Sequence, residues 1–178
     1  LAVTLKGAIA EEFSLTEGLV DTAVASNFLS SFADRYDSMI MWLDFPYLLG
    51  GNAFAYEFSI KNDIRGIGQP IFDATRQVGS RGRLSSIVQM GSLANYPAST
   101  ETTFLGTNTT MDILGQEVGH RWLAFLAVFQ PGNPALLGRS FAHWSFFFDS
   151  QASDTEGNGI RDTGNGMSKE QSARLFQP

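Results

Sequence analysis

Apolar residues at helical spacing follow a helix-start pattern near the N-terminus. Ser14-Leu15-Thr16-Glu17 has the spacing of a capping box, and the apolar positions after it recur on one helix face. These positions are Leu19, Val20, Ala23, Val24, Phe28 and Phe32. The pattern predicts an N-terminal helix over about residues 15–35.

Short apolar and alternating segments predict strands in the middle of the chain. Residues 39–43 form a compact apolar run, and residues 54–60 alternate apolar and polar positions, which is typical of a strand with a half-exposed face. Residues 83–93 favour another strand. Residues 61–83 are rich in glycine and predict a long irregular connection, while residues 94–108 are polar and predict a loop.

The clearest helix is predicted at about residues 110–129. Thr109 and Asp112 have the spacing of an N-terminal cap, and Pro131-Gly132 would end the helix. Its apolar positions include Leu114, Val118, Leu123 and Leu126. So many apolar residues on one helix indicate a largely buried cylinder.

The C-terminal part alternates apolar and polar blocks. Residues 144–148 favour a strand, and residues 149–167, rich in Gly, Asp, Asn and Ser, favour a loop. Ser168-Lys169-Glu170-Gln171 resembles the start of a last short helix. Because strands and helices do not alternate strictly, the pattern predicts an α+β fold.

Length and composition predict one folded domain over residues 1–178. The chain has 178 residues, of which 43% are hydrophobic and 17% are charged. We expect a sheet-and-helix part over about residues 1–130 and a small C-terminal part over about 131–178. Since the chain begins at Leu1, we expect it to be excised from a larger protein.

Charge and cysteine content narrow the classes of partner. The net charge is −6 and the 12 basic residues are scattered, so no nucleic-acid partner is expected. The longest apolar run is too broken to span a bilayer, so no membrane insertion is expected. The chain has no Cys, which excludes disulfides and thiolate metal sites.

The candidate chemistry lies on the predicted helix 110–129. In a metallopeptidase helix of the form H-E-x-x-H, the two His hold one Zn²⁺ from the same face and the Glu acts as general base. Here Gln116 and His120 have the i, i+4 relation of the two ligands, and Glu117 has the position of the base. The spacing of Glu117 and Arg121 also fits an ordinary ion pair on a helix surface.

The string Leu114-Gly115-Gln116-Glu117-Val118-Gly119-His120-Arg121-Trp122-Leu123-Ala124-Phe125 resembles a group of bacterial zincin-like metallopeptidases. The resemblance includes residues 62–68, 104–108, 142–147 and 156–158, and so covers roughly residues 36–160. It implies a mixed β-sheet packed against the active-site helix and the N-terminal helix. It also implies an extracellular or cell-surface protein that acts on a peptide or protein substrate.

The resemblance also implies roles for individual residues. In the gluzincin class the third zinc ligand is a Glu from a later segment, often followed by Gly, and Glu156-Gly157 fits this pattern. Glu117 would act as general base on a metal-bound water. A sheet-edge strand near residues 84–91 would align an extended peptide.

The number of histidines decides which ligand sets are available. The chain has only two, His120 and His143, so a site of three His cannot be built from it. The first set that we consider is therefore His120, His143 and Glu156 around Zn²⁺. In the second, Gln116 is itself a ligand or orients one. An amide oxygen is a poor zinc ligand, so Gln116 implies activity that is reduced or lost.

Two readings without catalysis stay open. In one, the chain keeps the zincin fold as a binding or structural module of a secreted protein, with His143 a packed histidine beside an aromatic cluster. In the other, Ca²⁺ stabilises the module through residues 154–162. Five residues there match positions of an EF-hand loop, although Asn165 replaces its final Glu: Asp154, Glu156, Asn158, Gly159 and Asp162.

Overall fold

Helices and short strands are mixed along the part of the chain that this computed structural model describes. The described residues are 17–49, 53–106, 108–122, 125, 137, 143–149, 156–162 and 167–170, with backbone alone for 17–20 and from 144 onward. The α-helices are α2 (Glu17–Ser31) and α3 (Thr110–Gly119), and the 3₁₀ helices are η2 (Thr75–Val78) and η3 (Leu93–Asn95). The strands are β1 (Ser38–Leu43), β2 (Tyr56–Ser59), β3 (Lys61–Asn62), β4 (Phe72–Asp73), β5 (Ser86–Ser92), β6 (Trp144–Asp149), β7 (Glu156–Asp162) and β8 (Met167–Glu170). The α+β class is confirmed.

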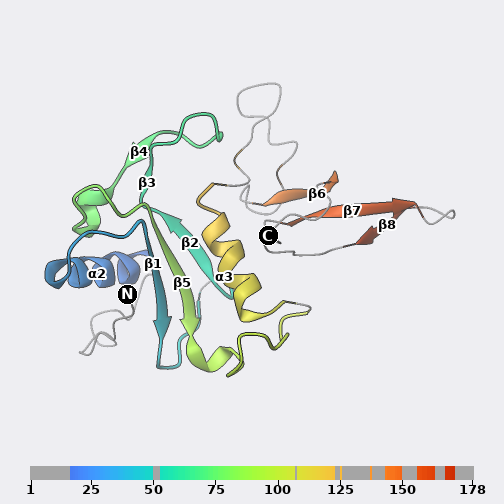
Figure 1. The fold of residues 1–178 in the computed structure, drawn as a ribbon, viewed down its shortest axis with the longest axis horizontal. Helices are drawn as coiled ribbons and strands as arrows, with labels where there is room; N and C mark the ends of the chain where they lie inside the picture. The colour runs from blue at the N-terminus through green and yellow to red at the C-terminus, as the bar shows by residue number, and fades with distance from the viewer. Residues whose placement is uncertain are drawn as a thin grey trace.

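A mixed three-stranded sheet organises the N-terminal part. Its order is β1-β5-β2, with β1 parallel and β2 antiparallel to the central β5 (Figure 1). Met41 pairs with Gln89 but Leu43 pairs with Ser92, so β5 carries one extra residue there. Gly91 lies at this bulge with a φ of 70°, a backbone conformation that is strained for any residue with a side chain.

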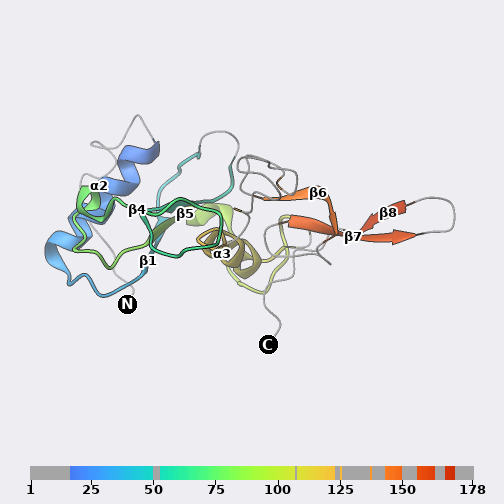
Figure 2. The same cartoon turned by 90° about the horizontal axis from the view of Figure 1, so that it is seen from above.

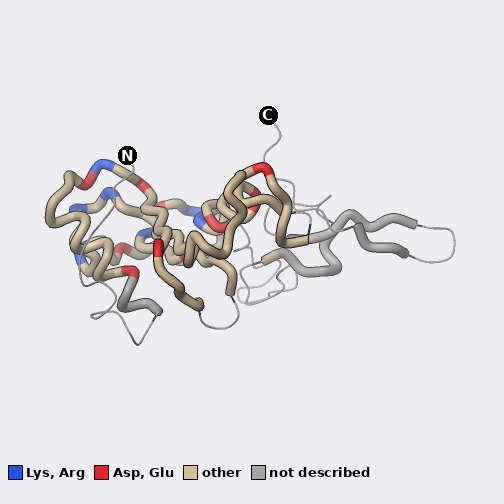
Figure 3. The backbone as a smooth tube through the Cα atoms, turned by 90° about the horizontal axis from the view of Figure 1, so that it is seen from below, with Lys and Arg blue, Asp and Glu red and all other residues tan. Residues whose placement is uncertain are grey.

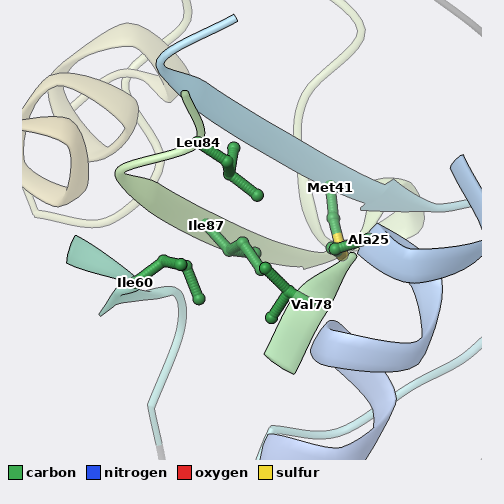
Figure 4. Close-up of a cluster of buried hydrophobic side chains, with 6 residues drawn as sticks. All are labelled: Ala25, Met41, Ile60, Val78, Leu84 and Ile87. Carbon is green, nitrogen blue, oxygen red and sulfur yellow. The ribbon is translucent and has the colours of Figure 1, made fainter. Parts of the chain in front are cut away.

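All seven residues of β5 are buried, because helices cover both faces of the sheet. Ile87 packs toward α2 in a first core cluster, shown in Figure 4. The members of this cluster are Ala25, Met41, Ile60, Val78, Leu84 and Ile87. Val88 and Met90 point to the opposite face and pack with Ile113 of α3. The alternation along β5 therefore divides the core into an α2 layer and an α3 layer.

One buried polar network ties α2 to the sheet. Asp21 is 1% exposed, and its carboxylate accepts a hydrogen bond from Gln89 Nε2 at 3.0 Å and another from the Tyr56 hydroxyl at 2.5 Å. Tyr56 and Gln89 are register partners on β2 and β5. Because buried polar groups need partners, these bonds fix how α2 sits on the sheet.

The second sheet has the order β6-β7-β8 and lies beyond α3 from the first sheet (Figures 1 and 2). β6 runs parallel to β7, and β7 runs antiparallel to β8. Residues 149–167 were expected to be a loop and residues 168–171 to start a helix. Both expectations are wrong for the described residues, since 156–162 form β7 and 167–170 form β8, where strand pairing overrides the local Gly and Asn content.

The helix expected at about 110–129 is also shorter than its apolar pattern predicts. α3 ends at Gly119, and the amides of Arg121 and Trp122 bond Val118 O and Gly119 O in tighter turns. Glycine is a weak helix former, and Arg121 is drawn away into a buried polar cluster described below. The expected end near Pro131-Gly132 lies outside the described residues.

Other expectations for the N-terminal part hold with adjusted bounds, although residues 61–83, expected to be irregular, contain β3, β4 and η2. The first helix runs from Glu17 to Ser31, within the expected 15–35, and its capping residue Ser14 is outside the described residues. Strands are confirmed near 39–43, 54–60 and 83–93. The strand near 84–91 is not an edge, however, because β5 pairs on both sides.

The described backbone carries interspersed acidic and basic positions (Figure 3). In the described part of the chain, neither α2 nor α3 is long and apolar enough to cross a bilayer.

Replacing Asp21 with Ala tests the buried network. The change leaves Gln89 and Tyr56 without their acceptor, so the free energy of unfolding should fall by about 2–4 kcal/mol. Urea unfolding followed by circular dichroism measures this loss. The exposed Glu101→Ala is the matched control and should change stability by less than about 0.5 kcal/mol. Equal effects of the two changes would contradict the assignment.

Candidate functional site

The candidate site is built on α3, whose start is firmly capped. The Thr109 hydroxyl accepts from Asp112 N, and the Asp112 carboxylate accepts from Thr109 N at 2.8 Å, which completes the predicted capping box. The apolar face of α3, with Ile113, Leu114 and Val118, packs against the α3 layer of the sheet. This packing fixes the rotation of the helix and so the direction of its polar residues.

Gln116 and His120 lie one turn apart and meet the same partner, His143. Gln116 Nε2 is 3.3 Å from His143 Nε2. The rings of His120 and His143 are edge-on, with centroids 4.7 Å apart and planes at 89°. Both histidines are about nine-tenths buried, at 9% and 8% exposed. Three residues selected from the sequence thus come together, although His143 is far from α3 along the chain.

The contact between Gln116 and His143 joins a side-chain amide to an imidazole. An amide NH₂ donates but does not accept, so this contact is a hydrogen bond in the tautomer whose Nε2 is an acceptor. In that tautomer Gln116 occupies the Nε2 lone pair.

Glu117 is buried on the same helix. It is 7% exposed, and its Oε2 lies 4.0 Å from His120 Nε2, too far for a hydrogen bond. Its charge also reaches Tyr96, where burial and, to a lesser extent, Glu117 raise the pKa of the phenol. Tyr96 donates to Met90 O at 2.7 Å and stays neutral at physiological pH. Glu117 is thus a carboxylate held between the imidazole pair and an aromatic cluster.

The backbone of Glu156 lies near this group. Glu156 begins β7 and is the register partner of Trp144, the residue after His143. Its side chain is outside what the structure describes. Strand pairing, rather than a loop, therefore brings Glu156 to the neighbourhood of His143.

Among the side chains that the structure describes, no group of three or more His, Cys, Asp or Glu is placed to hold a metal ion. Two imidazoles and one carboxylate come close, but a third ligand would have to come from elsewhere. Residues 156–162 of the expected EF-hand-type loop lie in the extended strand β7, and Ca²⁺ binding by this segment stays a prediction. Asp154 and Asn165 lie outside the described residues.

A second polar cluster, which sequence reasoning missed, lies at the end of α3. Arg121 is 4% exposed and does not sit on a helix surface, as the i, i+4 spacing from Glu117 suggested. Its guanidinium reaches Asn62 Oδ1 at 3.5 Å and Asp63 Oδ1 at 3.8 Å. The quoted segments that resemble metallopeptidases contain all three residues, but nothing in them indicates that they meet.

Glu57 belongs to the same cluster and was expected on a half-exposed strand face. It pairs with Val88 on β5, so it points to the α3 layer, while Phe58 on the other face is 41% exposed. Burial raises the pKa of Glu57 to about 7, against the lowering effects of the Ser59 hydroxyl and of Arg121. A polar position in an alternating strand was therefore a half-buried, titratable one.

Comparisons of the chain with protein-family models, with curated proteins and with solved structures found no match.

The raised pKa of Glu57 predicts a pH-dependent stability. Between pH 4.5 and about 7 the folded chain holds the Glu57 proton more tightly than the unfolded chain. The free energy of unfolding should therefore fall as pH rises through this window, by on the order of 3 kcal/mol from this group. Urea unfolding at a series of pH values measures the decrease.

Glu57→Gln is the informative variant because its side chain does not titrate. The variant should lose most of the decrease in stability between pH 4.5 and 7 that the unmodified chain shows. The exposed Glu101→Gln should keep it. If Glu57→Gln leaves the pH profile unchanged, Glu57 does not titrate near neutrality.

Proposed function

We propose that this chain is a zincin-like domain related to the zinc-dependent peptidases, with His120, His143 and Glu156 as metal ligands and Glu117 as general base. The observation that carries the proposal is the convergence of Gln116 and His120 on His143. The i, i+4 pair of a metallopeptidase helix faces the only other imidazole of the chain.

The donor chemistry suits Zn²⁺, which binds imidazole nitrogen and carboxylate oxygen. The rings of His120 and His143 lie side by side, with centroids 4.7 Å apart, and both are about nine-tenths buried. The third donor in this proposal is Glu156, supported by the pairing of its backbone with Trp144. Gln116 contacts His143 Nε2 at 3.3 Å, so this contact would have to open before that nitrogen could bind Zn²⁺.

The residues of the chain divide the peptidase chemistry between them. When bound, Zn²⁺ would act as a Lewis acid on the carbonyl of the scissile peptide bond. Glu117, which is buried next to Gln116 in the chain with its carboxylate 4.0 Å from His120 Nε2, would accept the proton of the attacking water. Tyr96 would stay protonated and donate to Met90 O, so it takes no part as a base.

A different strand takes the substrate-aligning role from residues 84–91. In the described part of the sheet, the unpaired edges belong to β1 and β2, and β2 is the one that packs against α3. An extended peptide can add to such an edge through backbone hydrogen bonds. We assign this role to Tyr56–Ser59.

One contact favours a non-catalytic module as the second candidate. His143 Nε2 cannot accept the Gln116 amide hydrogen and bind an ion with the same lone pair. Gln116 thus competes with metal for this nitrogen. A domain that keeps the fold and uses the imidazole pair structurally would retain this contact permanently.

Metal content separates the two candidates. Protein purified without chelator and analysed by mass spectrometry should contain about one Zn²⁺ per chain. The metal should be lost in His120→Ala, His143→Ala and Glu156→Ala, and kept in the control Asp154→Ala, which tests the Ca²⁺ reading. Absence of transition metal, together with no change in melting temperature on adding Zn²⁺, would refute the zinc proposal.

Two further variants test the roles of Glu117 and Gln116. Glu117→Gln should reduce hydrolysis of a casein or peptide-library substrate by roughly 10²–10⁴-fold while leaving zinc content intact. Gln116→His should tighten zinc binding roughly tenfold or more, since imidazole replaces an amide. Unchanged affinity in Gln116→His would place residue 116 away from the ion.

A further inference from the structure

The conformation of His120 depends on the residues that follow it. His120 is the C-cap of α3, and the next two residues continue the chain in tight turns to Val118 O and Gly119 O. Trp122 is 47% exposed and offers little anchorage. Arg121 is the buried residue at this turn, so it is the one able to hold the end of the helix.

Arg121 is anchored by a rigid acceptor. Asn62 is fully buried, and its side-chain amide nitrogen lies 3.0–3.3 Å from the carbonyl oxygens of Ile64, Gln69 and Pro70. Its oxygen accepts from Ile64 N at 3.0 Å and also faces the Arg121 guanidinium. The segment from Asn62 to Pro70 is thereby organised around one side chain, which leaves the Asn62 oxygen fixed in position.

Two carboxylates lie near the same guanidinium. Asp63, the residue after β3, lies 3.8 Å from Arg121, is 61% exposed and is itself paired with Lys61 at 2.9 Å. The positive charge of Arg121 lowers the pKa of Glu57 on β2, against the raising effect of burial. A buried guanidinium without such partners would be strongly unfavourable, so the cluster determines where Arg121 lies.

We propose that Arg121 is a positioning residue for His120: its guanidinium, held by Asn62 and Asp63 and facing Glu57, fixes the turn that places the His120 ring against His143. One peptide bond separates Arg121 from His120, so a displacement of the anchored side chain passes directly to the ring. The role assigned to His120 as a ligand rests on the proposed function. The positioning itself does not.

A surface ion pair supplies a contrast within the same chain. Arg83 and Asp37 are 2.7 Å apart, with side chains 57% and 64% exposed, whereas Asp63 is 61% exposed but Arg121 only 4%, so the two pairs differ in the burial of the arginine. Such pairs contribute little, because water screens them. Arg83→Met is therefore the matched control for Arg121→Met.

The test observes the histidine rings directly. With ¹⁵N-histidine, ring nitrogen shifts report the tautomer and surroundings of each imidazole, and His143→Gln assigns the two rings because the chain has no others. In metal-free protein, Arg121→Met should shift the His120 ring signals and weaken the ring-to-ring nuclear Overhauser effect with His143. Arg121→Lys should restore them in part, since Lys keeps the charge but not the planar fork. Arg83→Met should leave them unchanged.

Zinc affinity, measured by competition with a chelator, gives the second readout. Arg121→Met should weaken zinc binding roughly 10-fold or more, as loss of an outer partner of a ligand does. Asp63→Asn should weaken it less, and Arg83→Met should leave it unchanged. If Arg121→Met does not fold, Arg121→Lys and Asp63→Asn carry the same test with graded shifts of the His120 signals.

The outcomes separate the two proposals. Ring shifts in a chain that binds no zinc would support the positioning role while the proposed function fails. The positioning role alone would be overturned if Arg121→Met bound zinc normally and its His120 signals matched those of the unmodified chain.

Discussion

Burial of β5 along its whole length is the constraint on which the rest of the structure depends. A strand that is covered on both faces and paired on both edges needs one helix layer per face and a neighbouring strand on each side. α2 and α3 supply the layers, and the alternation of Ile87 with Val88 decides which helix each side chain meets. The polar Gln89 in this strand requires a buried acceptor, and Asp21 on α2 provides it.

The same constraint determines where the candidate site can form. α3 buries its apolar face on β5, so Gln116, Glu117 and His120 are carried at the boundary between the first sheet and the second (Figure 2). The residues that would complete the proposed site belong to the second sheet, where His143 precedes β6 and Glu156 begins the neighbouring β7.

Two polar groups flank the end of α3 and differ in kind. The imidazole pair with Gln116 can exchange partners, because His143 Nε2 accepts either an amide hydrogen or an ion. In the other group, the buried Arg121 guanidinium contacts the buried Asn62 amide, and its charge acts on the half-buried Glu57. Such a pairing would suit a binding site, because the rigid Arg121 cluster limits how far the neighbouring imidazoles move.

Local patterns in the sequence determined the elements of the N-terminal part, the cap at Thr109 and the grouping of Gln116, Glu117 and His120 on one helix. These features depend on residues that are near one another in the chain, where spacing translates directly into geometry. Only the tertiary structure decided that α3 stops at Gly119, that residues 156–162 form a strand, and that Glu57 is half-buried. Each of these depends on a partner far away in the sequence: Asn62 for Arg121, β6 and β8 for β7, and α3 for Glu57. Pairing and burial energies of this kind exceed local propensity, so no local pattern in the chain reports them.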